Sequence, residues 1–320
     1  MPRGARLDAP GTLHHVIIRG IEKGNIVRDD EDRKEFLRRM GELVQGTGTS
    51  IYAFALMTNH AHILLKSGGQ GLSTFMRRLL SGYAQYYNRR HKRVGHLFQN
   101  RYKSIICEED AYFDKLVAYI HLNPLRAGLV NSIEELSTYP WCGHAVMMKK
   151  VHYKWFDRDY VLRFFGEKER GARRVYLAYL EEEIGENREK ELSGGGLLRS
   201  HGGGWSKVQS MRKQGIKALS DDRILGGDSF VREVLQEAED QAEELLVAKN
   251  RSNQIQKDID EVCSKEGITV AALRSGSRKG KLPAIRKALA EKFVNEYGLS
   301  LAETARQLWV TTAAVSYMVR

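Results

Sequence analysis

Strand-like and helix-like segments alternate between residues 10 and 145, and this alternation limits the possible folds more than any other feature. Runs of β-branched and apolar residues predict strands, and apolar residues at helical spacing predict helices. The helix at 110–123 is expected to end at Pro124, which cannot continue a helix without losing a hydrogen bond. We therefore expect an α+β domain with helices packed on an antiparallel sheet. The predicted strands are 13–19 and 51–65 (a strand pair or one long bent strand), and the other predicted helices are 29–44 and 72–91.

The character of the sequence changes after Pro140. Residues 150–190 are mostly helical in pattern, aromatic and charged, and glycine-rich stretches follow at 193–196 and 202–204. Such stretches are typical of a flexible loop or linker, and the sequence beyond them has only helical patterns. We predict a domain over 1–145, a helical extension with the glycine-rich linker over 146–225, and an all-α C-terminal domain over 226–320.

The charge balance favours a polyanionic partner. Lys and Arg outnumber Asp and Glu by 51 to 40, and the pI is near 9.5. The three cysteines, Cys107, Cys142 and Cys263, are widely spaced and odd in number, which argues against a disulfide framework and fits a reducing cytosol. No apolar run is long enough for a membrane span, and the N-terminus lacks the apolar core of a secretory signal. We therefore expect a soluble cytoplasmic protein without a membrane partner.

Two histidines form the first candidate site. His60 and His62 are two residues apart in an apolar segment, so on a strand both side chains project to the same side. Two such imidazoles can bind a divalent metal if a third ligand is present. A hydrogen-bonded pair of core histidines is the alternative. We expect His14 and His15 to be ordinary strand residues.

Tyr119 and Asn123 form the second candidate site, because residues four apart on a helix lie on one face. Asn123 could offer a carbonyl oxygen to the metal while Tyr119 faces the same site. The metal would polarise a phosphodiester oxygen, and a positioned phenolate would attack phosphorus in line. The alternative is structural, since Asn commonly ends helices and Tyr commonly fills cores. We expect His121 to be exposed or to lie behind the ligands.

The same two sites carry a family resemblance. Residues 58–62 and 119–128 resemble the HUH and tyrosine motifs of the single-tyrosine, IS200-like transposases, and are most similar to the REP-associated tyrosine transposases. The resemblance spans about residues 5–145. Three further segments resemble the same family: 14–20, 29–33 and 95–103.

The resemblance implies a ferredoxin-like fold, a divalent metal (Mg²⁺ or Mn²⁺) bound by His60 and His62, and Tyr119 as the nucleophile of a 5′-phosphotyrosine intermediate. The family often has Gln four residues after the tyrosine, where this chain has the shorter Asn123. The resemblance also implies a homodimer that acts on single-stranded DNA folded into hairpins.

A basic stretch between the two sites is the candidate path for single-stranded DNA. Residues 77–103 contain no Asp or Glu, and aromatic residues are interleaved with the cations. Cations can neutralise phosphates and aromatic rings can stack on unpaired bases. The alternative is a solvated basic helix whose tyrosines face the core. The predicted DNA contacts are Arg89, Arg90, Arg93 and Arg101.

The C-terminal residues have the periodicity of a helix-turn-helix. Segments 300–308 and 310–317 would form its two helices, with Thr312 and Ser316 presented to the major groove. Trp309 stands where a turn glycine is usual, so we expect an altered turn. The alternative is a small helical bundle without DNA contact.

Residues 259–320 resemble the DNA-binding domain of the bacterial replication initiator DnaA. The resemblance implies that the loop cations Arg278, Lys279 and Lys281 contact phosphates of duplex DNA. This chain lacks the Asp-His-(Ser/Thr)-Thr that usually begins the recognition helix of that family. The base specificity of the initiator is therefore not expected here.

Together these patterns predict a metal-dependent tyrosine DNA transposase with an added duplex-binding domain. One alternative is a catalytically inactive DNA-binding regulator that uses the helix-turn-helix. Another is a metal hydrolase with water as its nucleophile, for which Tyr119 would be dispensable.

Overall fold

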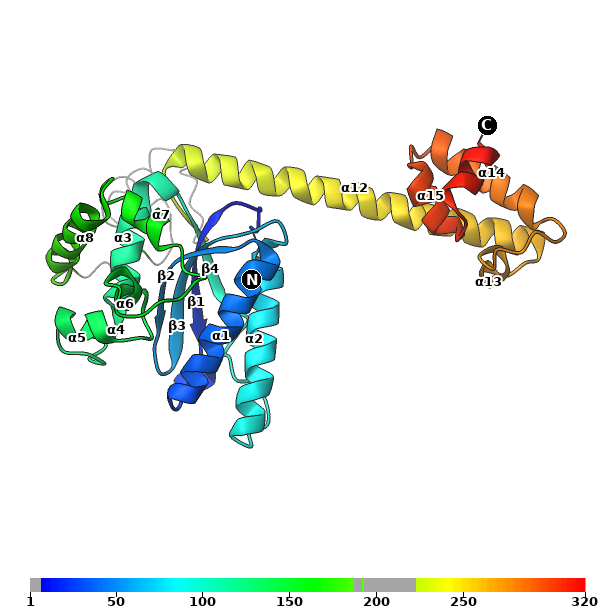
Figure 1. Cartoon of the computed structure of the whole chain (residues 1–320). Coiled ribbons are helices and arrows are strands. Elements are labelled where there is room, and N and C mark those ends of the chain that lie inside the picture. Colours follow the sequence, from blue (N-terminus) through cyan, green and yellow to red (C-terminus); the bar gives the residue numbers. More distant parts are fainter. Residues whose placement is uncertain (1–6, 187–191, 193–222, 320) are drawn as a thin grey trace, which may run out of the picture. The chain divides into compact units, whose positions relative to one another are not determined.

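The computed structural model describes residues 7–186, 192 and 223–319 (Figure 1). The chain divides into two compact units, Met1–Ala238 and Glu239–Arg320. The glycine-rich stretches predicted to form a linker lie outside the described residues, and the three-part domain division stays a prediction. Within the described part of the chain, no helix is long and apolar enough to cross a membrane.

The first unit is built around a five-stranded sheet with the order β2-β3-β1-β4-β5. The first four of these pair antiparallel, and β5 pairs parallel with β4. With helices after β1 and β3, this is the ferredoxin-like split β-α-β arrangement, and the predicted α+β class is confirmed. The parallel strand β5 was not predicted. The strands are β1 (Leu13–Arg19), β2 (Ser50–Leu56), β3 (His60–Lys66), β4 (Lys103–Cys107) and β5 (Ile224–Leu225).

Helices α1 (Asp30–Thr47) and α2 (Gly71–Arg90) cover one face of this sheet (Figure 1). The α1 helix begins where the side chain of Asp29 accepts a hydrogen bond from the Asp32 amide. It ends at Gly48, whose φ of +68° is readily adopted by glycine. Large buried side chains of both helices fill the space against the sheet.

The opposite face carries α3 (Glu109–His121) and the helices that follow it (Figure 1). Helices α7 and α8, which the sequence assigns to an extension, pack against β2 and α3 and belong to the first unit. The elements after α3 are α4 (Asn123–Arg126), α5 (Ile133–Thr138), α6 (Gly143–Met147), α7 (Arg158–Arg163) and α8 (Glu169–Glu183).

Other segments of the chain pair with parts of β2 and β4, the outer strands of the antiparallel part of the sheet. At the β4 edge, β5 adds the parallel pair, and the Glu108 amide donates to the Leu225 carbonyl at 2.8 Å. At the β2 edge, the Leu56 amide donates to the Trp141 carbonyl at 2.9 Å, and the Asp157 amide donates to Ile51 at 3.0 Å.

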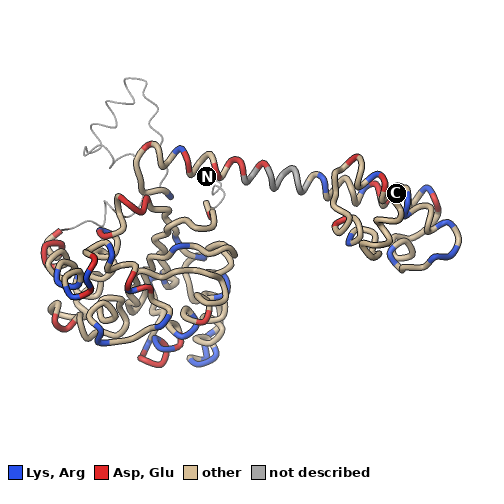
Figure 2. Tube along the Cα trace, turned by 45° about the horizontal axis from the view of Figure 1, so that its top comes forward, with Lys and Arg blue, Asp and Glu red and all other residues tan. Residues whose placement is uncertain are grey.

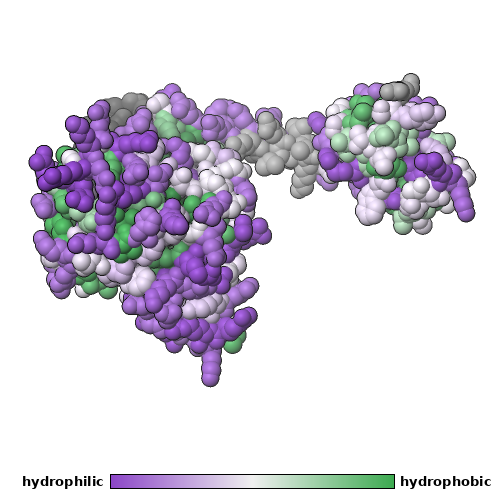
Figure 3. Space-filling view, viewed as in Figure 1, coloured by the Kyte–Doolittle hydropathy of each residue, from purple (hydrophilic) through white to green (hydrophobic). Residues whose placement is uncertain are grey.

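The second unit is helical throughout its described residues. Ser300 and Glu303 form a capping box that starts the helix at Leu301, and Phe293 and Leu308 lie in a separate apolar core. The surface of the molecule is largely hydrophilic in the view of Figure 3. The helices are α12 (Asp228–Glu266, which begins in the first unit), α13 (Val270–Leu273), α14 (Leu282–Asn295), α15 (Leu301–Leu308) and α16 (Thr312–Met318).

Candidate active site

His60 and His62 project from β3 on the face of the sheet that α3 covers. The pairing of β3 with β1 sets Arg19 opposite His60 and Ile17 opposite His62. Lys103 of β4 lies opposite Ile17 on the other side of β1. Opposed residues in antiparallel strands share a face, as do residues two apart, so these five side chains form one patch.

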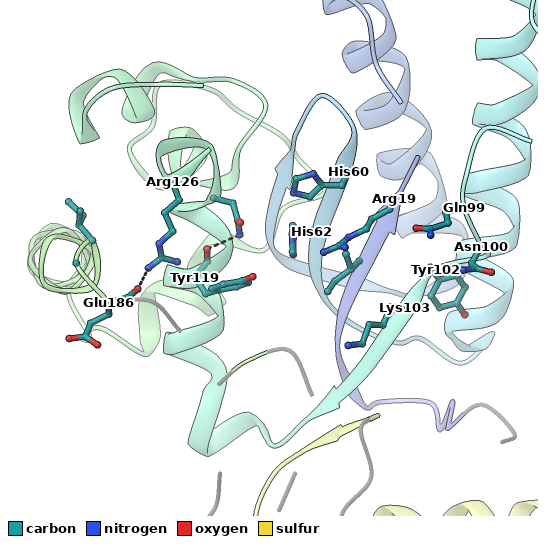
Figure 4. A pocket seen from close by; sticks show the side chains of 14 residues that line it. Arg19, His60, His62, Gln99, Asn100, Tyr102, Lys103, Tyr119, Arg126 and Glu186 are labelled. Carbon is teal, nitrogen blue, oxygen red and sulfur yellow. Dashed lines mark hydrogen bonds between the residues drawn. The ribbon is translucent and has the colours of Figure 1, made fainter. Parts of the chain in front are cut away.

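Tyr119 of α3 reaches the same patch (Figure 4). Its ring centroid lies 5.8 Å from that of His62 in an edge-on contact, and the side chain is largely buried. A cavity of about 690 Å³ is lined by both residues together with His60 and Asn123. The structure therefore brings the predicted nucleophile and the three predicted metal ligands to one cavity.

Asn123 is held in a defined orientation beside Tyr119. Its side-chain nitrogen donates to the Tyr119 carbonyl at 2.9 Å, one helical turn back (Figure 4). This bond uses the amide nitrogen, so the amide oxygen is the atom that a cation would meet.

The two histidines are oriented by different neighbours. His60 Nδ1 lies 2.6 Å from the Asn59 side-chain oxygen, and His62 Nδ1 lies 3.0 Å from His15 Nε2. Burial, assisted by the nearby His15, His60 and Arg19, holds the pKa of His62 well below its usual value. His62 is therefore neutral near pH 7, which is the protonation state that a metal ligand requires.

His15 belongs to the site, although its sequence position suggested an ordinary strand residue. It is fully buried, its ring stacks on that of His62 with centroids 5.2 Å apart, and it lies 5.8 Å from the Tyr119 ring. Burial lowers the pKa of His15 to about 4. His15 meets His62 through the register between β1 and β3. The local sequence does not reveal this register, so the sequence alone could not identify His15 as a site residue. His14, on the opposite face, bonds to Ser104 instead at 3.0 Å.

The donor atoms at the site suit a divalent metal, although they include no carboxylate. Two neutral imidazoles and one amide oxygen could bind Mg²⁺ or Mn²⁺ together with oxygen atoms from substrate and water. Among the described residues, no group of three or more His, Cys, Asp and Glu side chains could hold a metal ion. His60, His62 and Asn123 remain the candidate ligands.

His121 lies behind the site and is fully buried, so it is not exposed to solvent. Its Nδ1 lies 2.8 Å from the hydroxyl of Tyr176, which lies 2.7 Å from His144 Nδ1. A Cβ atom on Gly143 would lie 2.4 Å from His121 Nε2, so α6 approaches this histidine closely. The cluster joins α3, which carries Tyr119, to α6 and α8.

Two of the predicted DNA-contacting arginines are engaged within the protein. Arg90 forms ion pairs with Asp29 at 2.8 Å and with the fully buried Asp32 at 2.6 Å. Arg93 donates to the Asn88 side chain at 3.2 Å. These contacts assign Arg90 and Arg93 a structural role in addition to any contact with DNA.

Arg89 and Arg101 are exposed, as a DNA-contacting role requires. Arg101 lines a second cavity of about 780 Å³ beside α2. Two of the interleaved tyrosines face inward, because Tyr83 and Tyr87 are buried and their hydroxyls donate to backbone carbonyls at 2.7 and 3.1 Å. Those two tyrosines therefore belong to the core, as the alternative interpretation held.

In the second unit, Arg278 and Lys279 are exposed in the loop before α14, where Figure 2 marks Lys and Arg in blue. Lys281 forms an ion pair with Glu266 at 2.9 Å. Arg286 is buried and donates to the Leu273 and Ser277 carbonyls, and these hydrogen bonds stabilise the conformation of the loop.

Helices α15 and α16 are separated by three residues, and Trp309 adopts a left-handed conformation there with φ of +55°. The turn thus forms without the usual glycine. The Thr311 side chain caps α16 at the Ala314 amide. Thr312 is exposed and Ser316 is half-buried, so both remain candidates for DNA contact.

Comparisons with known proteins bear on the segment that holds this site. Residues 11–123 match the model of a family described as IS200-like transposases, and the match includes His60, His62, Tyr119 and Asn123. No curated protein matches the chain. A solved structure described as a REP-associated tyrosine transposase bound to a REP hairpin is 13% identical, with a TM-score of 0.40. The aligned region covers 49% of this chain and 98% of the chain in that structure.

Proposed function

We propose that the first unit is a transposase that cleaves and rejoins single-stranded DNA through a 5′-phosphotyrosine at Tyr119, and that the second unit binds duplex DNA. The observation that carries the proposal is the placement of Tyr119. It shares one cavity with His60, His62 and Asn123, within the segment that matches the IS200-like transposases. Hairpin-forming DNA is the expected substrate.

The reaction requires two exchanges at one phosphorus atom. In the first, the Tyr119 hydroxyl loses its proton and attacks the phosphorus, the bond to the 3′ oxygen breaks, and that oxygen takes up a proton. In the second, a 3′ hydroxyl attacks the phosphotyrosine and the phenol is released. The number of phosphoester bonds is unchanged, so rejoining needs no nucleotide cofactor.

His60, His62 and Asn123 would hold the metal, Mg²⁺ or Mn²⁺, which when bound supplies positive charge to the phosphodiester oxygens. Since Nδ1 of His62 faces His15, Nε2 is the nitrogen left for a ligand. His62 must then carry its proton on Nδ1 and donate it to His15 Nε2. His15 thus selects the tautomer that a metal ligand needs.

The test uses labelled single-stranded hairpin libraries, Mn²⁺ and the full chain. Wild type is expected to form a covalent adduct that Tyr119→Phe abolishes and EDTA suppresses. The control is Tyr112→Phe, because Tyr112 lies on the same helix outside the cavity. Cleavage that survives Tyr119→Phe would support the water-dependent hydrolase, and DNA binding without any adduct would support the inactive regulator.

A further inference from the structure

Three cations surround Tyr119 and the two histidines. Arg19 and Lys103 belong to the sheet side of the cavity, and Arg126 belongs to the helix side, with Tyr119 between them (Figure 4). All three residues are exposed. Among the described residues that line the cavity, Glu186 is the one acid, so the lining has an excess of positive charge.

Arg126 is anchored by the end of α8. Its Nη2 atom donates to the carbonyls of Glu183 and Glu186, both at 2.9 Å. Carbonyls at the C-terminal end of a helix lack partners within the helix and favour a cation. The guanidinium carbon is thereby held 5.7 Å from the centroid of the Tyr119 ring. Residues beyond the family match therefore contribute a charge beside the nucleophile.

Arg19 and Lys103 are positioned by the strands. Arg19 lies opposite His60, and Lys103 lies opposite Ile17, which is itself opposite His62. The two cations thus flank the histidines on β1 and β4. Rigid strands fix where such side chains originate more tightly than a loop would.

We propose that Arg19, Lys103 and Arg126 form a binding site for a single phosphate, the one that Tyr119 attacks. This site rests on the proposed function. The candidate metal ligands, His60, His62 and Asn123, are all uncharged. The protein therefore places no carboxylate among these ligands to offset the charge of the three cations. A phosphodiester supplies one negative charge and two non-bridging oxygens, which guanidinium and ammonium groups bind through charge-assisted hydrogen bonds. The same groups would stabilise the charge that builds up during transfer.

The experiment measures binding without reaction. The Tyr119→Phe chain is kept in EDTA and given a hairpin oligonucleotide that it has selected by binding from a random single-stranded library. Each phosphate in turn is replaced by an uncharged methylphosphonate. One position is expected to weaken binding by about tenfold or more, as loss of a charge-assisted contact does.

Arg126→Gln should remove that sensitivity, so that the same methylphosphonate costs less than about threefold in the variant. Arg158→Gln is the matched control, because Arg158 also anchors α8, through Glu169 at 3.0 Å, and does not line the cavity. It should keep the full tenfold sensitivity. The same measurement is made with Lys103→Gln. Lys103 is an exposed strand residue that does not support α8.

Equal loss of affinity at every phosphate would overturn the proposal in favour of general attraction to the DNA backbone. The proposal would also be overturned if the loss of affinity caused by that one methylphosphonate persisted in both Arg126→Gln and Lys103→Gln. The proposed transferase is judged separately by the covalent adduct. If the adduct forms but no single methylphosphonate penalty depends on Arg126 and Lys103, the phosphate site alone is refuted. If one penalty depends on these cations but no adduct forms, the transferase alone is refuted.

Discussion

Replacing Tyr176 by Phe removes the hydroxyl that connects three helices behind the candidate active site. This hydroxyl is fully buried, and burial raises the pKa of Tyr176 well above its usual value, so it stays protonated. It bonds to His121 Nδ1 at 2.8 Å and to His144 Nδ1 at 2.7 Å. The variant keeps the ring and loses both bonds.

The expected cost follows from the two nitrogens left behind. Each buried polar atom that loses its partner costs about 1–3 kcal/mol, so the loss of two partners should lower the free energy of unfolding by about 2–6 kcal/mol. In a unit of this size, 1 kcal/mol corresponds to about 2–4 °C, and the Tm should fall by about 4–24 °C. Tyr153→Phe is the control, since the Tyr153 hydroxyl makes a single 3.1 Å bond to the Pro140 carbonyl. It should cost about 1 kcal/mol.

Scanning calorimetry of the full chain, checked by urea unfolding, provides the comparison. The two histidines are neutral in the folded state because burial lowers the pKa of His144 to about 4 and holds the pKa of His121 well below its usual value. The measurement is therefore made at pH 7.5, where the unfolded histidines are neutral as well. Equal losses for Tyr176→Phe and Tyr153→Phe would refute the claim that the hydroxyl joins a buried polar cluster.

Three further predictions concern acid, the basic helix and the second unit. Burial lowers the pKa of both His14 and His144 to about 4, so between pH 6.5 and 4.5 the unfolded chain binds protons that the folded chain does not. Urea unfolding should show that the free energy of unfolding decreases as the pH is lowered through this window. The decrease should be about 1.4 kcal/mol per pH unit for each histidine. Arg89→Gln should lower the salt dependence of DNA binding by about one unit of slope at unchanged Tm, whereas Arg90→Gln should lower the Tm because it breaks two ion pairs. Arg278→Gln should weaken duplex binding in a fluorescence anisotropy titration and leave adduct formation on single strands unchanged.

The positions of His60 and His62 could be predicted because two-residue periodicity depends only on the strand itself. The inclusion of His15 could not be predicted, since it depends on the register between β1 and β3, which local sequence does not encode. The strand β5 escaped prediction for the same reason. Two residues form it, and its pairing with β4 joins segments more than a hundred residues apart.

Pro124 shows a different limit of sequence reasoning. It was expected to end the helix that carries Tyr119, and α3 does end at His121. A short helix, α4, nevertheless resumes at Asn123, with Pro124 in its first turn. Proline is tolerated there because the first amides of a helix have no partner within it. Asn123, the first residue of α4, bonds back through its side chain to the Tyr119 carbonyl.

The pairing at both sheet edges limits how two copies of this protein could associate. An open edge offers unpaired amides and carbonyls onto which another chain can add a strand. Here β5 occupies one edge, and the segments at Trp141 and Asp157 bond to the other. To pair with β2, or with Ile106 and Cys107 of β4, a second copy would have to displace these segments. The expected homodimer, if light scattering detects it, should therefore survive substitutions on β2.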